Sequence, residues 1–161
     1  MHGEHRGEHQ MDMAVASVRP LYDQFKDWIV ASAEKVPEEH YGFQPTPEVR
    51  TFGQILGHVA NANYLFCSGA SGAANPNAKN FEELTAKADL VAALEGAFAF
   101  CDETYQMNDR KAMEQVSFFG RDGSRLWVLA FNAIHNSEHY GNLVTYMRMK
   151  GIVPPSSAQM Q

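Results

Sequence analysis

Three histidines have the residue type and spacing that best suit chemistry in this chain. His135 and His139 lie four residues apart in a run with helical periodicity, so their side chains project from one face about a turn apart. His58 lies in a second segment of helical periodicity. Three neutral imidazoles from two helices would bind a borderline divalent metal ion and leave a coordination position open. Such an ion lowers the pKa of a water or thiol toward neutrality, so the nucleophile would be that molecule rather than a side chain.

Simpler interpretations of these histidines remain open. A lone histidine on an apolar face is more often a hydrogen-bonded core residue, and an HxxxH pair also occurs on solvated faces. The polar stripe of the last predicted helix favours a metal site, because buried polar groups without partners cost about 1–3 kcal/mol each. The stripe contains Val128, Asn132, His135, His139, Asn142, Tyr146 and Met149. Asn132, Glu138 and Asn142 are near enough in sequence to fix the imidazole tautomers.

Four helices are expected to position these residues. Apolar residues recur at steps of three and four over residues 11–36, 51–66, 88–107 and 124–150. Thr51 and Gln54 form a capping box at the start of the second stretch. Between the third and fourth helices, an aromatic segment ends in Asp122-Gly123, which predicts a small hairpin with an Asp-Gly turn.

The chain is predicted to be one all-α domain. Residues 11–155 form the bundle, with tails at residues 1–10 and 156–161. The first tail carries His2, His5 and His9, which can bind stray metal but are not expected in the site. It resembles neither a helix nor a signal peptide, and is either an artefact or the mature end of an exported chain.

Charge and hydropathy exclude two classes of partner. The net charge is −6, from 13 basic and 19 acidic residues, and no basic cluster is present that could displace counterions from nucleic-acid phosphates. No apolar run approaches the roughly 20 residues needed to span a membrane. We therefore expect a small-molecule substrate, with neither nucleic acid nor a membrane as partner.

The state of the two cysteines, free or disulfide-bonded, would indicate the compartment in which the protein works. Cys67 and Cys101 are not spaced as a metal-binding pair, and both fall on apolar helix stripes. We favour free buried thiols and a cytoplasmic protein. The alternative is one disulfide in an exported protein whose signal peptide has been removed.

Two segments resemble the DinB/YfiT-like family of metal-binding helical bundles. They are Thr51-Phe-Gly-Gln-Ile-Leu-Gly-His58-Val and the segment from His135-Asn-Ser-Glu-His139-Tyr-Gly to Pro154-Pro155, and the match covers about residues 11–155. The resemblance implies an up-up-down-down four-helix bundle, often dimeric, so a homodimer is expected. It also implies a metal held by residues matching His58, His135 and His139. Characterised relatives include transferases and isomerases that use low-molecular-weight thiols.

The leading hypothesis is thus a divalent-metal-dependent enzyme, a thiol-dependent transferase or isomerase or a hydrolase, acting on a small electrophile. Zinc or nickel is the favoured metal, with manganese or iron as alternatives, and a low-molecular-weight thiol is a candidate second cofactor. Arg121, Arg125 and Arg148 are the arginines considered for binding its carboxylates. The competing hypotheses are a non-catalytic metal- or ligand-binding dimeric bundle and a purely structural bundle.

Overall fold

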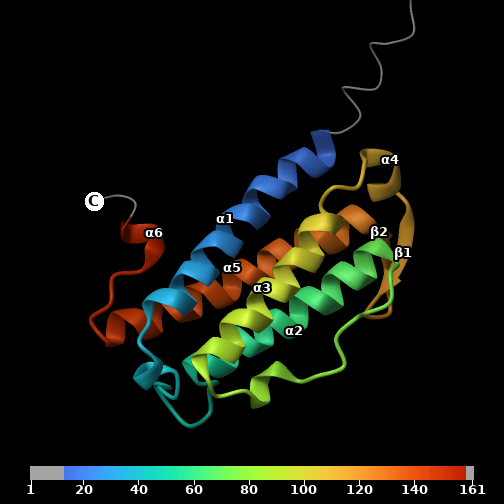
Figure 1. Cartoon of the computed structure of the whole chain (residues 1–161). Coiled ribbons are helices and arrows are strands. Elements are labelled where there is room, and N and C mark those ends of the chain that lie inside the picture. The colour runs from blue at the N-terminus through green and yellow to red at the C-terminus, as the bar shows by residue number, and fades with distance from the viewer. Residues whose placement is uncertain (1–12, 159–161) are drawn as a thin grey trace, which may run out of the picture.

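The computed structural model describes residues 13–158, which form a bundle of long helices (Figure 1). The long helices are α1 (Met13–Lys35), α2 (Phe52–Ser71), α3 (Lys87–Thr104) and α5 (Arg125–Met149). The shorter elements are η1 (Glu38–His40), η2 (Phe81–Glu83), α4 (Asp109–Ala112), β1 (Gln115–Phe118), β2 (Arg121–Ser124) and α6 (Pro155–Ala158). The predicted all-α bundle with a small hairpin is confirmed. The predicted tail at residues 1–10 lies outside the described residues.

The directions of the helices differ from the order that the family resemblance implied. Cys67 and Cys101, each near the end of its helix, are bonded, so α2 and α3 run parallel. Arg125 at the start of α5 donates to the carbonyl of Ala70 at the end of α2, so these two helices are antiparallel. Since α1 runs alongside α5 in the same direction (Figure 1), the order is up-down-down-up, and up-up-down-down is wrong.

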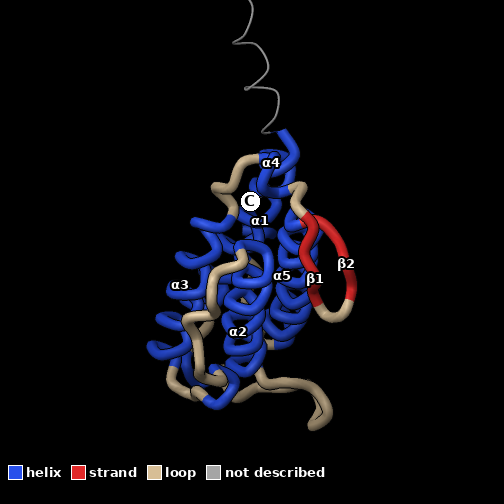
Figure 2. The backbone as a smooth tube through the Cα atoms, turned by 90° about the vertical axis from the view of Figure 1, so that its right-hand side faces the viewer, coloured by secondary structure: helices blue, strands red, loops and turns tan. Residues whose placement is uncertain are grey.

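Parallel α2 and α3 require a long connection between them. Residues 72–86, here called the crossover segment, run back along the outside of α2 (Figure 2). The segment contains η2 and packs closely on α2 at Gly57, where an added Cβ would lie 2.3 Å from the carbonyl oxygen of Phe81. Glycine at this position therefore allows the segment to lie against the helix.

Helix α2 begins as predicted and ends later than predicted. The hydroxyl of Thr51 accepts from the backbone of Gln54, whose side chain accepts in return from the backbone of Thr51. The helix continues past Phe66 to Ser71, although this end is rich in small residues. Tertiary packing explains the difference, because the ring of Phe118 lies against Gly69 at a separation that leaves no room for a Cβ.

The hairpin of β1 and β2 turns at a different dipeptide from the predicted one. Phe118 pairs with Arg121, so Phe119-Gly120 forms the turn, with φ values of 52° and 72°. Positive φ at both central positions is typical of the type I′ turn of tight hairpins. The Asp-Gly prediction was wrong because Gly123 lies within β2, where the Trp127 ring covers it.

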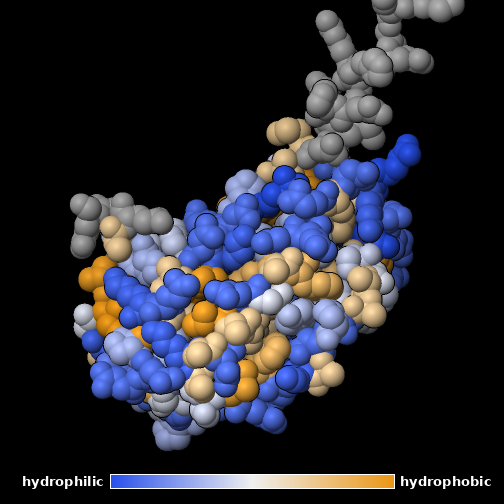
Figure 3. Space-filling model, viewed as in Figure 1, coloured by the Kyte–Doolittle hydropathy of each residue, from blue (hydrophilic) through white to orange (hydrophobic). Residues whose placement is uncertain are grey.

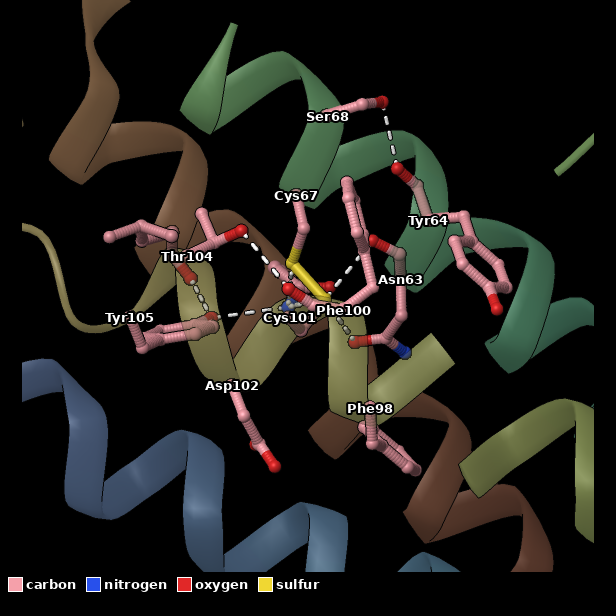
Figure 4. Close-up of a disulfide and its surroundings, with 12 residues drawn as sticks. Asn63, Tyr64, Cys67, Ser68, Phe98, Phe100, Cys101, Asp102, Thr104 and Tyr105 are labelled. Atoms are coloured by element: carbon pink, nitrogen blue, oxygen red, sulfur yellow. Dashed lines mark hydrogen bonds between the residues drawn. A yellow bond between two sulfur atoms is a disulfide. The ribbon is translucent and has the colours of Figure 1, made fainter. Parts of the chain in front are cut away.

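A disulfide joins α2 to α3 in the core. Cys67 and Cys101 have a Cα–Cα distance of 5.4 Å and both are fully buried. Figure 4 shows the bond between the two helices, with Asn63 and Tyr105 on either side. The preference for free thiols was therefore wrong, because parallel α2 and α3 place the two stripes face to face.

The face formed by α1 and α3 is mostly hydrophilic, with hydrophobic side chains gathered along the line between these helices (Figure 3). Residues 155–158 form α6, and its Ser156 accepts from the hydroxyl of Tyr140 on α5 at 2.6 Å. Among the described helices, none has a stretch long and apolar enough to cross a membrane.

Candidate metal centre

The three predicted histidines meet between α2 and α5. Nε2 of His135 lies 3.3 Å from Nε2 of His58 and 3.1 Å from Nε2 of His139. One ligand atom from each residue can be chosen so that all lie within 4.8 Å of one another. His139 is buried, while His58 and His135 are half-buried, so the cluster reaches the surface. The structure thus brings together two adjacent turns of α5, as the four-residue spacing predicted, and one turn of α2.

The separations between these nitrogens suit a shared metal ion. Two imidazole nitrogens at about 2.0–2.1 Å from one ion and at roughly 90–110° to each other are about 2.8–3.4 Å apart. Both Nε2–Nε2 distances that involve His135, 3.1 and 3.3 Å, fall within this range. The two pairs that involve His135 therefore have separations compatible with ligands of one divalent ion.

The outward-facing nitrogens of two histidines contact acceptors. Nδ1 of His139 lies 3.2 Å from Oδ1 of Asn142, and Nδ1 of His58 lies 3.4 Å from Oε2 of Glu82. Because an oxygen acceptor favours the proton on Nδ1, the lone pair of each ring is on Nε2 and points into the cluster. Lone pairs that converge in this way repel one another unless a cation, or a proton on Nε2 of His135, lies between them.

Of the three histidines, His135 is the one whose Nδ1 lacks a hydrogen-bond acceptor among the described residues. Its Nδ1 is buried and has no hydrogen-bond partner among residues 13–158. Its ring packs instead against Phe66, with centroids 5.4 Å apart. An unpaired buried nitrogen costs about 1–3 kcal/mol, so the ring position is held by packing and by whatever binds Nε2.

Burial keeps the cluster neutral. It lowers the pKa of His135 to about 4, and the neighbouring His139, His58 and Arg50 act in the same direction. Burial is also the main cause of the lowered pKa of His58, where Arg50 and His139 contribute. For His139 burial again lowers the pKa, while the hydrogen bond to Asn142 opposes it. All three rings are therefore neutral at pH 7, which is the form that coordinates a metal.

Of the residues predicted to orient the imidazoles, Asn142 does so. Glu138 makes no hydrogen bond to a histidine within the described part of the chain and lies at the rim of the cluster instead. Asn132 lies deeper in the core, where its amide donates to the hydroxyl of Tyr105 at 3.1 Å. In the predicted stripe, Met149 is exposed rather than buried.

Sequence reasoning missed a second buried amide near the site. Asn136, beside His135, is fully buried and pairs with Asn63 of α2, with N–O distances of 2.8 and 3.2 Å between their amides. No local signal marked it, because Asn63 falls five residues after His58, a spacing that places the two side chains on different faces of α2. The pair of amides fixes the register of α2 against α5 directly beneath the histidines.

Glu82 and Arg50 were also missed. Oε1 of Glu82 accepts from Nε of Arg50 at 2.6 Å, so one carboxylate connects Arg50 to His58. Both residues come from segments without periodicity, and the one available signal was the glycine at position 57, which lets the crossover segment approach His58.

The three arginines considered from the sequence lie elsewhere. Arg125 binds the carbonyl of Ala70 and lies 3.4 Å from a carboxylate oxygen of Glu114. Arg148 donates to Ser157, and Arg121 is exposed on the hairpin. None of them is close to the histidines in the contacts of residues 13–158.

A cavity of about 630 Å³ opens beside the cluster. Its polar lining consists of Glu48, Arg50, Glu138, His139, Asn142 and Tyr146. The volume is suitable for a small organic molecule. The arrangement can therefore hold a divalent ion and place a small ligand against it.

Comparison with known proteins agrees with the fold. The sequence model of the DinB superfamily matches residues 22–143, and the chain belongs to this superfamily. The uncharacterized protein YjoA of Bacillus subtilis is 25% identical over 122 residues, covering 74% of this chain and 79% of YjoA.

Two solved structures have a similar fold. A DinB-like protein from Bacillus cereus superposes with a TM-score of 0.76 at 17% identity, over 86% of this chain and 93% of its own. The DinB-like YjoA of Bacillus subtilis gives a TM-score of 0.61 at 22% identity, over 82% and 92%. At these identities the likeness extends to the fold and not to the chemistry.

Proposed function

We propose that this chain is a divalent-metal-dependent enzyme in which His58, His135 and His139 hold the ion. Zinc or nickel suits a set of neutral nitrogen ligands, with manganese or iron as alternatives. The observation that carries the proposal is the tautomer arrangement, in which acceptors at Nδ1 of His58 and His139 leave Nε2 lone pairs that point at a common centre.

The reaction class follows from the ligand set and the cavity. When bound, a divalent ion held by neutral nitrogens supplies Lewis-acid chemistry that makes a water or a low-molecular-weight thiol nucleophilic near neutral pH. The residues of the chain orient the imidazoles and provide a cavity for a small electrophile beside His139. We therefore propose a thiol-dependent transferase or isomerase, or a hydrolase, with a small-molecule substrate.

The direct test is metal content by mass spectrometry on protein lacking residues 1–10, so that the tail histidines do not contribute. We expect close to one ion per chain in the parent protein and almost none in the His135→Ala variant. The matched control is His40→Ala, because His40 lies 3.7 Å from Glu39 and outside the cluster. Equal metal in all three proteins, or none after reconstitution, would reject the metal centre.

A second measurement separates catalysis from binding alone. The metal-loaded protein is incubated with a panel of electrophiles, with and without glutathione, bacillithiol or mycothiol, and product formation is followed. Turnover that is lost in His135→Ala supports an enzyme. Stoichiometric metal without turnover on any member of the panel would favour the non-catalytic binding bundle.

A further inference from the structure

Arg50 lies beside the candidate metal centre and is anchored from one side. Its Nε donates to Oε1 of Glu82 at 2.6 Å, and its backbone carbonyl accepts from the hydroxyl of Tyr146 at 2.6 Å. The next residue, Thr51, is fixed as the cap of α2. Both the backbone and the inner edge of the guanidinium are therefore held in place.

The outer edge of the same guanidinium is available to a ligand. Neither terminal nitrogen of Arg50 has a hydrogen-bond partner among the residues that the structure describes, and the side chain is 43% exposed. Arg50 lines the cavity of about 630 Å³ together with His139 and Asn142. A guanidinium presents its donors as a planar fork, which matches the two oxygens of a carboxylate.

Arg50 is also connected to the histidines by contacts. The carboxylate of Glu82, which accepts from Nε of Arg50, lies 3.4 Å from Nδ1 of His58. On the other side, His139 lines the same cavity as Arg50. An anion held on the outer edge of Arg50 would therefore have the rest of its structure in the cavity beside His139.

We propose that Arg50 anchors the substrate, and that the substrate is a small monocarboxylic acid whose carboxylate binds the terminal nitrogens of Arg50 while its reacting group lies against the histidines. The inference rests on the proposed function, because it assumes that the reaction takes place at the metal centre. It explains why Nε of Arg50 is bound to Glu82 while its terminal nitrogens have no hydrogen-bond partner among the described residues.

The other charges of the cavity select a monoanion. Glu48 and Glu138 line the same cavity, and their carboxylates repel a phosphate dianion more strongly than a single carboxylate. A divalent ion on the histidines offsets these negative charges, so anion binding is expected to be strongest in the metal-loaded protein. Uncharged analogues lose the charge-assisted hydrogen bonds to Arg50.

The test is an NMR titration of the zinc-loaded protein with propionate, with propionamide and inorganic phosphate as comparison probes. We expect propionate to bind most tightly, and its dissociation constant to rise at least about tenfold in Arg50→Gln, since a hydrogen bond to a charged group contributes about 1.5–3 kcal/mol. Arg50→Lys keeps the charge and contact with Glu82 but lacks the fork, so we expect intermediate affinity. Arg121→Gln is the matched control and should bind propionate like the parent.

Zinc content is measured on every sample, which separates the two proposals. Propionate affinity that is unchanged in zinc-loaded Arg50→Gln would overturn the anchoring role while leaving the metal centre intact. Tighter binding of phosphate than of propionate would overturn the monocarboxylate assignment. A parent protein that holds no zinc would reject the proposed function and this inference with it. A role of Arg50 limited to holding Glu82 would change zinc affinity and not the preference for propionate over propionamide.

Discussion

Oε2 of Glu82 lies 3.4 Å from Nδ1 of His58, although Glu82 belongs to the short η2 helix and His58 to α2. A carboxylate behind a ligand histidine fixes the ring and its tautomer and raises the basicity of the coordinating nitrogen. Of the two acceptors at the histidine Nδ1 atoms, Asn142 is neutral and Glu82 is charged. Glu82 comes from a segment that the sequence pattern did not connect with the site.

Replacing Glu82 by Gln should weaken metal binding without removing it. The amide keeps the size of the side chain but loses the charge, and changes of this kind behind a ligand cost about 10–100-fold in metal affinity. Zinc affinity is measured by competition with a chromophoric chelator. Glu83→Gln, an exposed neighbour on the same η2, is the control and should match the parent. Equal affinities in all three proteins would show that Glu82 does not support His58.

Gly57→Ala should displace the crossover segment. The added Cβ would meet backbone atoms of Phe81 at 2.3 and 2.5 Å, and backbone cannot move aside as a flexible side chain can. We expect a loss of about 1–3 kcal/mol in the free energy of unfolding, typical of overpacking, together with weaker zinc binding. Gly141→Ala is the control, because its Cβ would have no neighbour within 4 Å and alanine favours helices. A fully stable Gly57→Ala protein would contradict the close packing.

Reduction of the disulfide should destabilise the bundle. Cys67 and Cys101 close a loop with a sequence separation of 34, and the chain-entropy relation for such a loop gives about 4 kcal/mol. For a chain of this size that corresponds to a fall of very roughly 10 °C in Tm, measured by calorimetry with and without a reductant. The Cys67→Ala/Cys101→Ala variant should not respond to the reductant. A parent protein with thiols shown by mass spectrometry to be free before reduction would contradict the bond.

We expect a homodimer, as the family resemblance implied, and the apolar patch of Phe119, Phe131 and Ile134 is the surface that suits it. Phe119 is 70% exposed and Ile134 66% exposed, and the rings of Phe119 and Phe131 both contact Phe66. The Phe119→Asp/Ile134→Asp variant should shift the mass measured by light scattering from dimer to monomer. The control Leu21→Asp introduces the same charge at an exposed apolar residue of α1 and should leave the mass unchanged. A monomeric parent protein would refute the expectation.

Local signals predicted the helices well where propensity and packing agree. The capping box of Thr51 and Gln54 and the four-residue spacing of His135 and His139 are both properties of adjacent turns, and each occurs in the structure. The end of α2 and the turn of the hairpin were misjudged because packing of Phe118 on Gly69 and of Trp127 on Gly123 decides them. Such contacts join distant parts of the chain.

The residues of the candidate site could likewise be predicted where they lie on helices and not where they lie in connections. The three histidines lie on periodic helices, so their faces could be predicted before the structure was known. Glu82 and Arg50 lie in connections, where the direction of a side chain depends on how the connection crosses the bundle. The pairing of Cys67 with Cys101 depends on α2 and α3 being parallel, and neither cysteine carries that information alone.

The long connection between two parallel helices also has a consequence for local opening of the folded protein. The amide of Phe81 donates to Oδ1 of Asn61 on the outer face of α2, so the crossover segment is docked on a helix that is already packed into the bundle. A segment of this kind can open while the rest of the molecule stays folded. Each opening would separate Glu82 from His58, so the local opening equilibrium would set how often the ring loses its carboxylate partner. Native-state hydrogen exchange at Phe81 would report this equilibrium independently of global unfolding.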